Sequence, residues 1–189
     1  MGFINCSQRG PILCTNKVCT LILILVCFTS GWMAKIWTIN ELSLAGTLNP
    51  ALADLKKICH LLQVELDTNV LIIECKSLEE FHTLTGKPYS IAAVYSKGVI
   101  WTQPFTILRS KGLLEEILTH ELLHHVLSLN FDLPEWAQEG LILYLTNVKP
   151  ENLVGRHKFH LLKFLKEVHN EDVLSFIDRY RRVPVDQSR

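Results

Sequence analysis

The sequence predicts an α+β domain in which a small sheet precedes a series of helices, behind an N-terminal hydrophobic segment. Three observations support this prediction. Short runs rich in β-branched residues occupy the middle of the chain, and apolar residues at helical spacing fill most of residues 112–180. Residues 18–34 are mostly apolar and carry no charged side chain. Runs of these three kinds are typical of strands, of amphipathic helices and of membrane or signal segments.

The first half of the domain is expected to begin with a helix, a buried strand and a second helix. Residues 51–64 carry apolar side chains at helical spacing. Val70 to Cys75 is β-branched and bounded by polar residues, which predicts a buried strand. Ser77 and Glu80 have the spacing of a capping box, so residues 77–82 should form a short helix.

A hairpin and four helices are expected to complete the domain. Residues 91–95 and 98–102 are short β-rich runs, and Ser96-Lys97-Gly98 between them is typical of a tight turn. The helical patterns cover residues 112–129, 132–146, 156–169 and 171–180. We therefore predict that the folded domain spans residues 51–180 and that residues 181–189 form a frayed tail.

The N-terminal segment is interpreted as a membrane anchor. Residues 1–17 contain Arg9 and Lys17 and no acidic residue. Residues 18–34 would span about 25 Å as a helix, the short end of the range for crossing a bilayer. We favour an uncleaved anchor, with a cleaved signal segment as the alternative, and residues 35–50 as a linker. The preceding positive charges place the N-terminus inside, so the domain should lie outside the cytoplasm, or else be secreted or periplasmic.

Composition limits the partners and the redox chemistry. Lys+Arg and Asp+Glu number 19 each, so a net charge of zero gives no reason to expect nucleic acid. Six cysteines are present, none in a C-x-x-C pair. Cys59 and Cys75 are expected to be thiols, although they could pair if the domain is exported. The oligomeric state is not indicated by the sequence.

A metal-ligand pattern lies in the helix predicted over residues 112–129. His120, Glu121 and His124 form H-E-x-x-H. Residues four apart share one face of a helix, so His120 and His124 can direct their imidazoles at one ion. Glu121 is rotated by about 100° from His120, where it can reach a water without binding the metal. Catalytic zinc usually takes three protein ligands, so a third ligand is expected elsewhere.

Glu139 is the best candidate for the third ligand. Fourteen residues separate it from His124, enough to end one helix and to begin another antiparallel to it. Glu135 is the alternative third ligand, but Asp132 and Glu135 have the spacing of a capping box. We therefore expect Glu135 to cap the second helix rather than to bind the metal. Gly140 has no side chain, so we expect the two metal-carrying helices to approach closely there.

These motifs resemble the gluzincin branch of the zincin metallopeptidases, whose pattern is H-E-L-x-H followed by P-x-W-x-x-E-G. The matching stretches here are His120-Glu-Leu-Leu-His124 and Pro134-Glu-Trp-Ala-Gln-Glu139-Gly140. The resemblance implies a zincin-like fold with a small mixed sheet, a central H-E-x-x-H helix and further C-terminal helices. It also implies Zn²⁺ bound by His120, His124 and Glu139, with Glu121 as the general base in peptide hydrolysis.

The resemblance carries further expectations about the site. Many zincins add an oxyanion donor, and Tyr144 is the candidate here. The strand before the metal helix should be a sheet edge lining the cleft, where Trp101 and Phe105 could flank the substrate or else pack in the core. Larger gluzincins have an acidic residue four positions after the third ligand, where this chain has Leu143. A partner for the ligand histidines must then come from elsewhere.

The sequence therefore predicts a membrane-attached or exported zinc peptidase acting on a peptide or protein substrate. Two alternatives remain open: a catalytically inactive zinc-binding module, and a metal-free interaction protein anchored in the membrane. Five other histidines are expected to be structural or surface residues rather than ligands. They are His60, His125, His157, His160 and His169.

Overall fold

The computed structural model describes residues 34–44, 46 and 49–182. The segment expected to be an anchor or a signal, residues 18–34, lies outside these residues except for Ala34. The tail from residue 183 also lies outside them. None of the helices in the described part of the chain combines the length and the hydropathy needed to cross a bilayer. The described residues belong to one compact unit.

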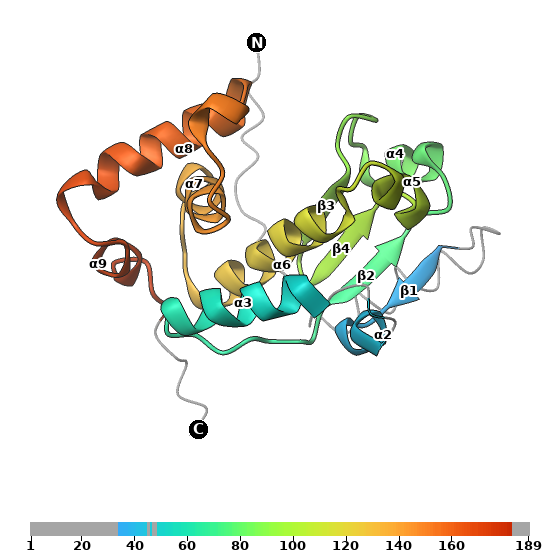
Figure 1. The fold of residues 1–189 in the computed structure, drawn as a ribbon, viewed down its shortest axis with the longest axis horizontal. Coiled ribbons are helices and arrows are strands. Elements are labelled where there is room, and N and C mark those ends of the chain that lie inside the picture. Colours follow the sequence, from blue (N-terminus) through green and yellow to red (C-terminus); the bar gives the residue numbers. More distant parts are fainter. Residues whose placement is uncertain (1–33, 45, 47–48, 183–189) are drawn as a thin grey trace, which may run out of the picture. The chain divides into compact units, whose positions relative to one another are not determined.

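The described residues form an α+β fold, as the sequence predicts (Figure 1). The strands are β1 (Lys35–Trp37), β2 (Leu71–Glu74), β3 (Ala93–Ser96) and β4 (Val99–Thr102). The first helices are α2 (Ile39–Leu44), α3 (Asn49–Leu61), α4 (Leu78–Thr85) and α5 (Phe105–Ser110). The later helices are α6 (Leu114–Asn130), α7 (Glu135–Leu145), α8 (Gly155–Glu167) and α9 (Val173–Asp178). Short 3-10 turns, Pro150–Asn152 and Val168–Asn170, flank α8.

The four strands form a small mixed sheet in the order β1-β2-β4-β3. β2 and β4 are parallel, and the two outer pairs are antiparallel. The interpretation of residues 35–50 as a linker is wrong, because Lys35–Trp37 pairs with β2 and α2 follows directly. Three residues of a largely exposed edge strand give no periodic pattern from which a strand could be predicted.

The predicted hairpin is present, but its place in the sheet differs from the expectation. Lys97 and Gly98 both have positive φ, as a two-residue turn that matches the strand twist requires. β4, the last strand before α6, is buried along its whole length between β2 and β3. β3 is an edge strand instead, because β4 pairs with β2 on one side and with β3 on the other.

The two aromatic residues that could have flanked a substrate belong to the core. Trp101 is 8% exposed and Phe105 is 3% exposed. The ring of Phe105 stacks on Trp37 with the ring centroids 6.0 Å apart. Core packing, the interpretation that the sequence favours for both aromatics, is therefore confirmed, and neither ring is exposed to flank a substrate. Cys59 and Cys75 are also buried and are not joined in a disulfide.

α6 is the central helix of the folded unit, as predicted. Its buried residues lie around most of its circumference, since it contacts β3, α3 and α7. The predicted capping box of α7 is wrong: Pro134 is the N-cap, and Asp132 and Glu135 pair with Arg182 and Arg156. In Figure 1, α7 is viewed nearly end-on, whereas the axis of α6 runs across the picture. The two helices therefore cross rather than run antiparallel.

The close approach expected at Gly140 occurs on the other side of α7. A Cβ at Gly140 would clash with the Cβ of Phe164 and would lie 2.7 Å from the carbonyl oxygen of His160, both on α8. Phe164 in turn contacts Phe176 on α9, with the ring centroids 5.4 Å apart. Gly140 therefore fixes α7 against α8, and the residue beside it, Glu139, is directed toward α6.

Candidate metal centre

The two histidines and Glu139 meet where α6 and α7 contact. The Nε2 atoms of His120 and His124, one turn apart on α6, are 3.1 Å from each other. Glu139 Oε2 lies 3.5 Å from Nε2 of His120, and Oε1 lies 3.3 Å from Nε2 of His124. No other group of His, Cys, Asp and Glu in the described ranges is close enough to share an ion. This cluster can hold a metal ion.

The separations of these ligand atoms fit a single ion. Ligands about 2.05 Å from a tetrahedral metal are separated from one another by about 3.3 Å. The two Nε2 atoms, 3.1 Å apart, lie close to that edge length. Each of them lies 3.3 to 3.5 Å from a different oxygen of Glu139, so the carboxylate can share one ion with both histidines. Oε2 of Glu139 is buried without a good hydrogen bond among the described residues, since His120 approaches it only to 3.5 Å. This oxygen is therefore available as a ligand.

Charges within the cluster shift the pKa values of its members. Burial by itself raises the pKa of Glu139, but the close imidazoles of His120 and His124 outweigh burial and hold that pKa far below its ordinary 4.5. Burial lowers the pKa of His124, but its contact with Glu139 raises it by more, to above the ordinary 6.5. Glu139 is therefore anionic at neutral pH, and a metal ion competes with a proton for His124.

Glu121 lies beside the cluster and is only 8% exposed. Burial raises the pKa of its carboxyl group, and the charges of His124 and His120 offset this only in part. The backbone of Tyr95 also lowers this pKa, but the net shift is a rise. A carboxylate whose pKa is raised toward neutrality is suited to accept a proton and to release it again.

Gln138 is a residue of the site that the sequence did not reveal. Its Nε2 lies 3.5 Å from the carbonyl oxygen of His124, and its side chain raises the pKa of the His124 ring. Leu143, where larger gluzincins carry an acidic partner, is buried among apolar residues instead. The one signal for Gln138 in the sequence is its position directly before Glu139. It can supply the partner that a ligand histidine needs.

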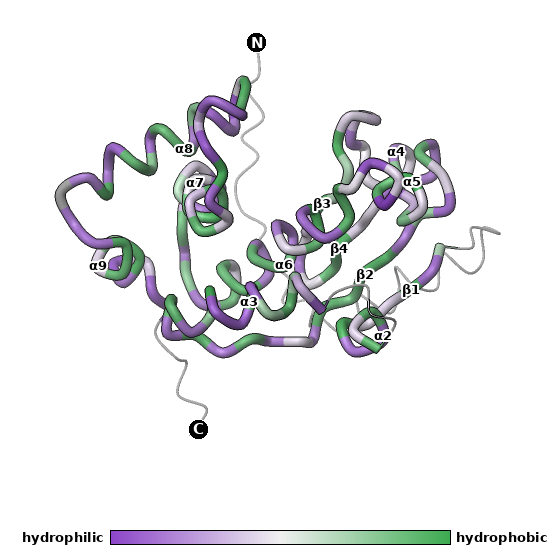
Figure 2. Tube along the Cα trace, viewed as in Figure 1, coloured by the Kyte–Doolittle hydropathy of each residue, from purple (hydrophilic) through white to green (hydrophobic). Residues whose placement is uncertain are grey.

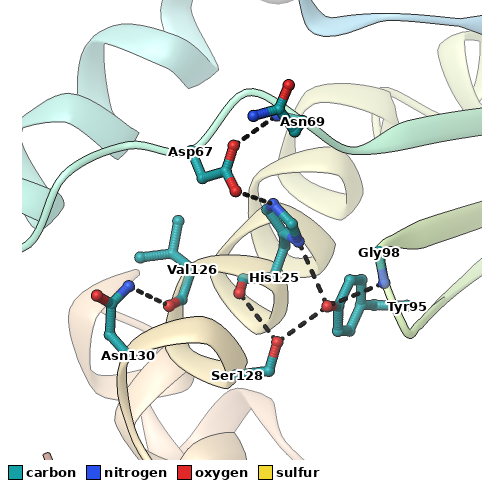
Figure 3. Close-up of polar contacts among 8 residues, drawn as sticks. All are labelled: Asp67, Asn69, Tyr95, Gly98, His125, Val126, Ser128 and Asn130. Carbon is teal, nitrogen blue, oxygen red and sulfur yellow. Dashed lines mark hydrogen bonds and ion pairs between the residues drawn. The ribbon is translucent and has the colours of Figure 1, made fainter. Parts of the chain in front are cut away.

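His125 is directed away from the cluster, toward the β3–β4 hairpin (Figure 3). Its Nδ1 lies 3.3 Å from the Tyr95 hydroxyl, which is also 2.9 Å from Ser128 Oγ and accepts a 3.1 Å hydrogen bond from Gly98 N–H. The carboxylate of Asp67 lies 3.9 Å from Nε2. Burial lowers the pKa of His125 by more than Asp67 raises it, so the ring is neutral near pH 7.

Tyr95 therefore connects the edge strand to the metal helix. Glu121, His125 and Ser128 follow one another at spacings of four and three, so they share one face of α6. The Tyr95 hydroxyl lies within hydrogen-bond distance of His125 and Ser128, and the Tyr95 backbone lowers the pKa of Glu121. β3 therefore lies against the face of α6 that carries Glu121.

Tyr144 is not brought to the cluster. Its side chain is 43% exposed, and its ring contacts Phe164 on α8 with the centroids 5.7 Å apart. Tyr144 lies one turn after Gly140 and so shares the face of α7 that is directed at α8, away from the face that carries Glu139. The expectation that it donates to an oxyanion is not supported by this geometry.

The other histidines lie away from the cluster. His60, His82, His157 and His169 are exposed. His160 is 5% exposed, so the expectation of a surface position is wrong for this residue. It is buried because α8 presses against α7 at Gly140, a contact between helices that helical periodicity alone cannot reveal.

Comparisons with known proteins identify no relative of this chain. No protein-family model matches the chain, no curated protein is significantly similar to it, and no solved structure shares its fold at a significant level. The resemblance to gluzincins therefore rests on the two motifs and on the cluster that they form.

Proposed function

We propose that the chain is a zinc-dependent peptidase of the gluzincin type, with a zincin-like fold around α6. One observation carries the proposal. The residues that the H-E-x-x-H…E pattern selects as ligands, although split between two helices, place their ligand atoms 3.1 to 3.5 Å apart. Glu121, which the same pattern selects as the base, lies beside them with a raised pKa.

The donor set favours zinc over the harder divalent ions. Two imidazoles and one carboxylate form a common three-ligand set of catalytic zinc, whereas magnesium and calcium prefer oxygen ligands. The side chains of His120, His124 and Glu139 are 24%, 13% and 18% exposed, so solvent and a substrate can reach them. A zinc ion bound there supplies a Lewis acid that acidifies water and polarises a substrate carbonyl.

Glu121 supplies the proton transfers. Its carboxylate takes a proton from the attacking water and then delivers it to the leaving amine of the cleaved peptide. Burial keeps the carboxylate poorly solvated, which makes it a better base than an exposed glutamate. Its carboxylate is buried beside the two ligand histidines, so the proton acceptor is in place before substrate binds.

The proposed peptidase acts outside the cytoplasm, attached to a membrane through residues 18–34 or released after cleavage of that segment. The support is the uncharged run and the two positive residues before it, Arg9 and Lys17. A reporter that is active only outside the cytoplasm, fused after Arg189, should be active. A silent reporter on a well-expressed fusion would refute this topology.

The ligand set is tested by metal content. The full chain is purified with its metal, and the zinc bound per chain is measured for the parent, for Glu139→Ala and for Glu135→Ala. Glu135 is the matched control, since it is one turn earlier on α7 and pairs with Arg156 at the surface. We expect Glu139→Ala to lose most of its zinc and Glu135→Ala to keep it. The opposite result would overturn the ligand assignment.

The base is tested with Glu121→Gln and a mixture of peptide substrates, with a chelator control. The variant should bind zinc as the parent does, because Glu121 is not proposed as a ligand. Hydrolysis should fall by about 10²-fold or more, the usual scale for loss of a general base. A parent that binds zinc and cuts no peptide would favour an inactive zinc-binding module. A parent without metal would favour an interaction protein.

A further inference from the structure

α8 has an exposed side that the proposed peptidase chemistry does not use. The helix packs through His160, Leu161 and Phe164, which are nearly fully buried. Phe159 and Leu162 are 60% and 48% exposed, large fractions for such residues. They are three positions apart and so lie together on the side opposite the buried residues. Figure 2 shows hydrophobic and hydrophilic residues alternating along this helix.

The charges nearest this apolar pair are positive, and the one acidic residue of α8, Glu167, is at the end of the helix. Residues 152–166 contain Arg156, Lys158, Lys163 and Lys166 and no acidic residue. Arg156 pairs with Glu135, and Lys163 lies over the ring of Trp136. Lys158 and Lys166 are exposed and form no ion pair within the part of the chain that the structure describes. At 100° per residue they stand near the apolar pair, on the outer side of α8.

We propose that this side of α8 binds the surface of an anionic lipid membrane. Phe159 and Leu162 would enter the boundary between headgroups and acyl chains, with the ammonium groups of Lys158 and Lys166 at the lipid phosphates. Aromatic and aliphatic residues among lysines are typical of helices that lie in the plane of a membrane interface. Lysine suits this place because its long stem follows an apolar surface while its charge stays in water.

A protein partner fits this surface less well. Protein interfaces are enriched in aromatic residues and arginine but depleted in lysine. On this side of α8 the two exposed cations without an ion-pair partner among the described residues, Lys158 and Lys166, are both lysines.

The test uses the full chain in lipid vesicles, with a photo-crosslinking amino acid in place of Leu162. Vesicles contain phosphatidylcholine alone or phosphatidylcholine with phosphatidylglycerol, and adducts are identified by mass spectrometry. The matched control carries the crosslinker in place of Leu44 on α2, which is 89% exposed and has no basic cluster beside it. Position 162 should form lipid adducts, mostly in the anionic vesicles, and position 44 should remain at background.

The lysines are tested by adding K158E and K166E to the chain that carries the crosslinker at position 162. Each lysine near an anionic surface strengthens binding about fivefold, so the adduct should fall by about 25-fold or more. Unchanged circular dichroism and zinc content would show that these variants are folded. Equal lipid adducts at positions 162 and 44 would overturn the proposal. So would adducts at position 162 that contain residues 1–33 or a second copy of the chain instead of lipid.

Discussion

Replacing Gly140 with alanine tests how α7 is held and therefore how Glu139 reaches the two histidines. In an unobstructed helix, glycine to alanine stabilises by about 1 kcal/mol. Here the added Cβ meets the Cβ of Phe164 and a backbone oxygen of α8, neither of which can rotate away. Overpacking costs about 1–3 kcal/mol, and two immobile groups this close place the cost near the upper end. Subtracting the gain of about 1 kcal/mol in helix propensity leaves an expected net loss of stability of about 2 kcal/mol.

The assay is thermal unfolding of the metal-free protein. For a chain of this size, about 2 kcal/mol corresponds to a Tm lower by about 4–8 °C. The matched control is Ala53→Gly on the exposed side of α3, which measures the helix propensity difference without a steric contact. Ala53→Gly should lower the Tm by about 2–4 °C. Replacing glycine with alanine in a helix without a steric contact would then raise the Tm by the same amount.

Gly140→Ala should also weaken metal binding, because a shift of α7 moves Glu139 and a metal site tolerates errors of only about 0.2 Å in ligand distance. Metal affinity is measured by competition with a chelator. A Gly140→Ala protein that melts above the parent, by about as much as Ala53→Gly melts below it, would refute the close packing of α7 on α8. The position of Glu139 would then have to depend on contacts of α7 other than the one with α8.

Three further predictions concern the surroundings of the cluster. Gln138→Leu should lower zinc affinity by about 10–100-fold in the same competition assay, and an unchanged affinity would show that Gln138 supports neither histidine. Tyr95→Phe should reduce the free energy of unfolding in urea by about 1–2 kcal/mol, because the hydroxyl that joins Ser128, His125 and Gly98 is lost; no change would refute that connection. The last prediction compares the free energy of unfolding of the metal-free parent with that of metal-free Glu139→Gln over a pH series. The parent should be more stable by the largest amount between pH 4.5 and pH 6.5, the ordinary pKa values of Glu139 and His124. The lowered pKa of Glu139 makes its contribution fade as pH falls below that range, and the raised pKa of His124 makes its contribution fade as pH rises above it; a pH-independent difference would contradict the ion pairing.

The sequence by itself determined the features that depend on residues close together in the chain. The four-residue spacing of His120 and His124 places them on one face of any α-helix, whatever surrounds it. The hairpin turn at Lys97-Gly98 and the cap of α4, where Ser77 accepts a hydrogen bond from Glu80 N–H, are also local. For the same reason the elements that the sequence predicted lie within a few residues of their observed bounds, whereas β1, α2 and α5 were not predicted.

Only the tertiary structure decided features that depend on how separate elements pack. β1 exists because β2 offers it a paired edge, and three residues carry no pattern of their own. Gly140 faces α8 rather than α6, Tyr144 follows it there, and His160 becomes buried in the same contact. The sequence nominated Glu139 as a ligand, but its meeting with the histidines depends on the crossing of α6 and α7. A side chain's spacing along its own helix is fixed by backbone geometry, whereas its partner on another helix is fixed by the shape of everything packed between them.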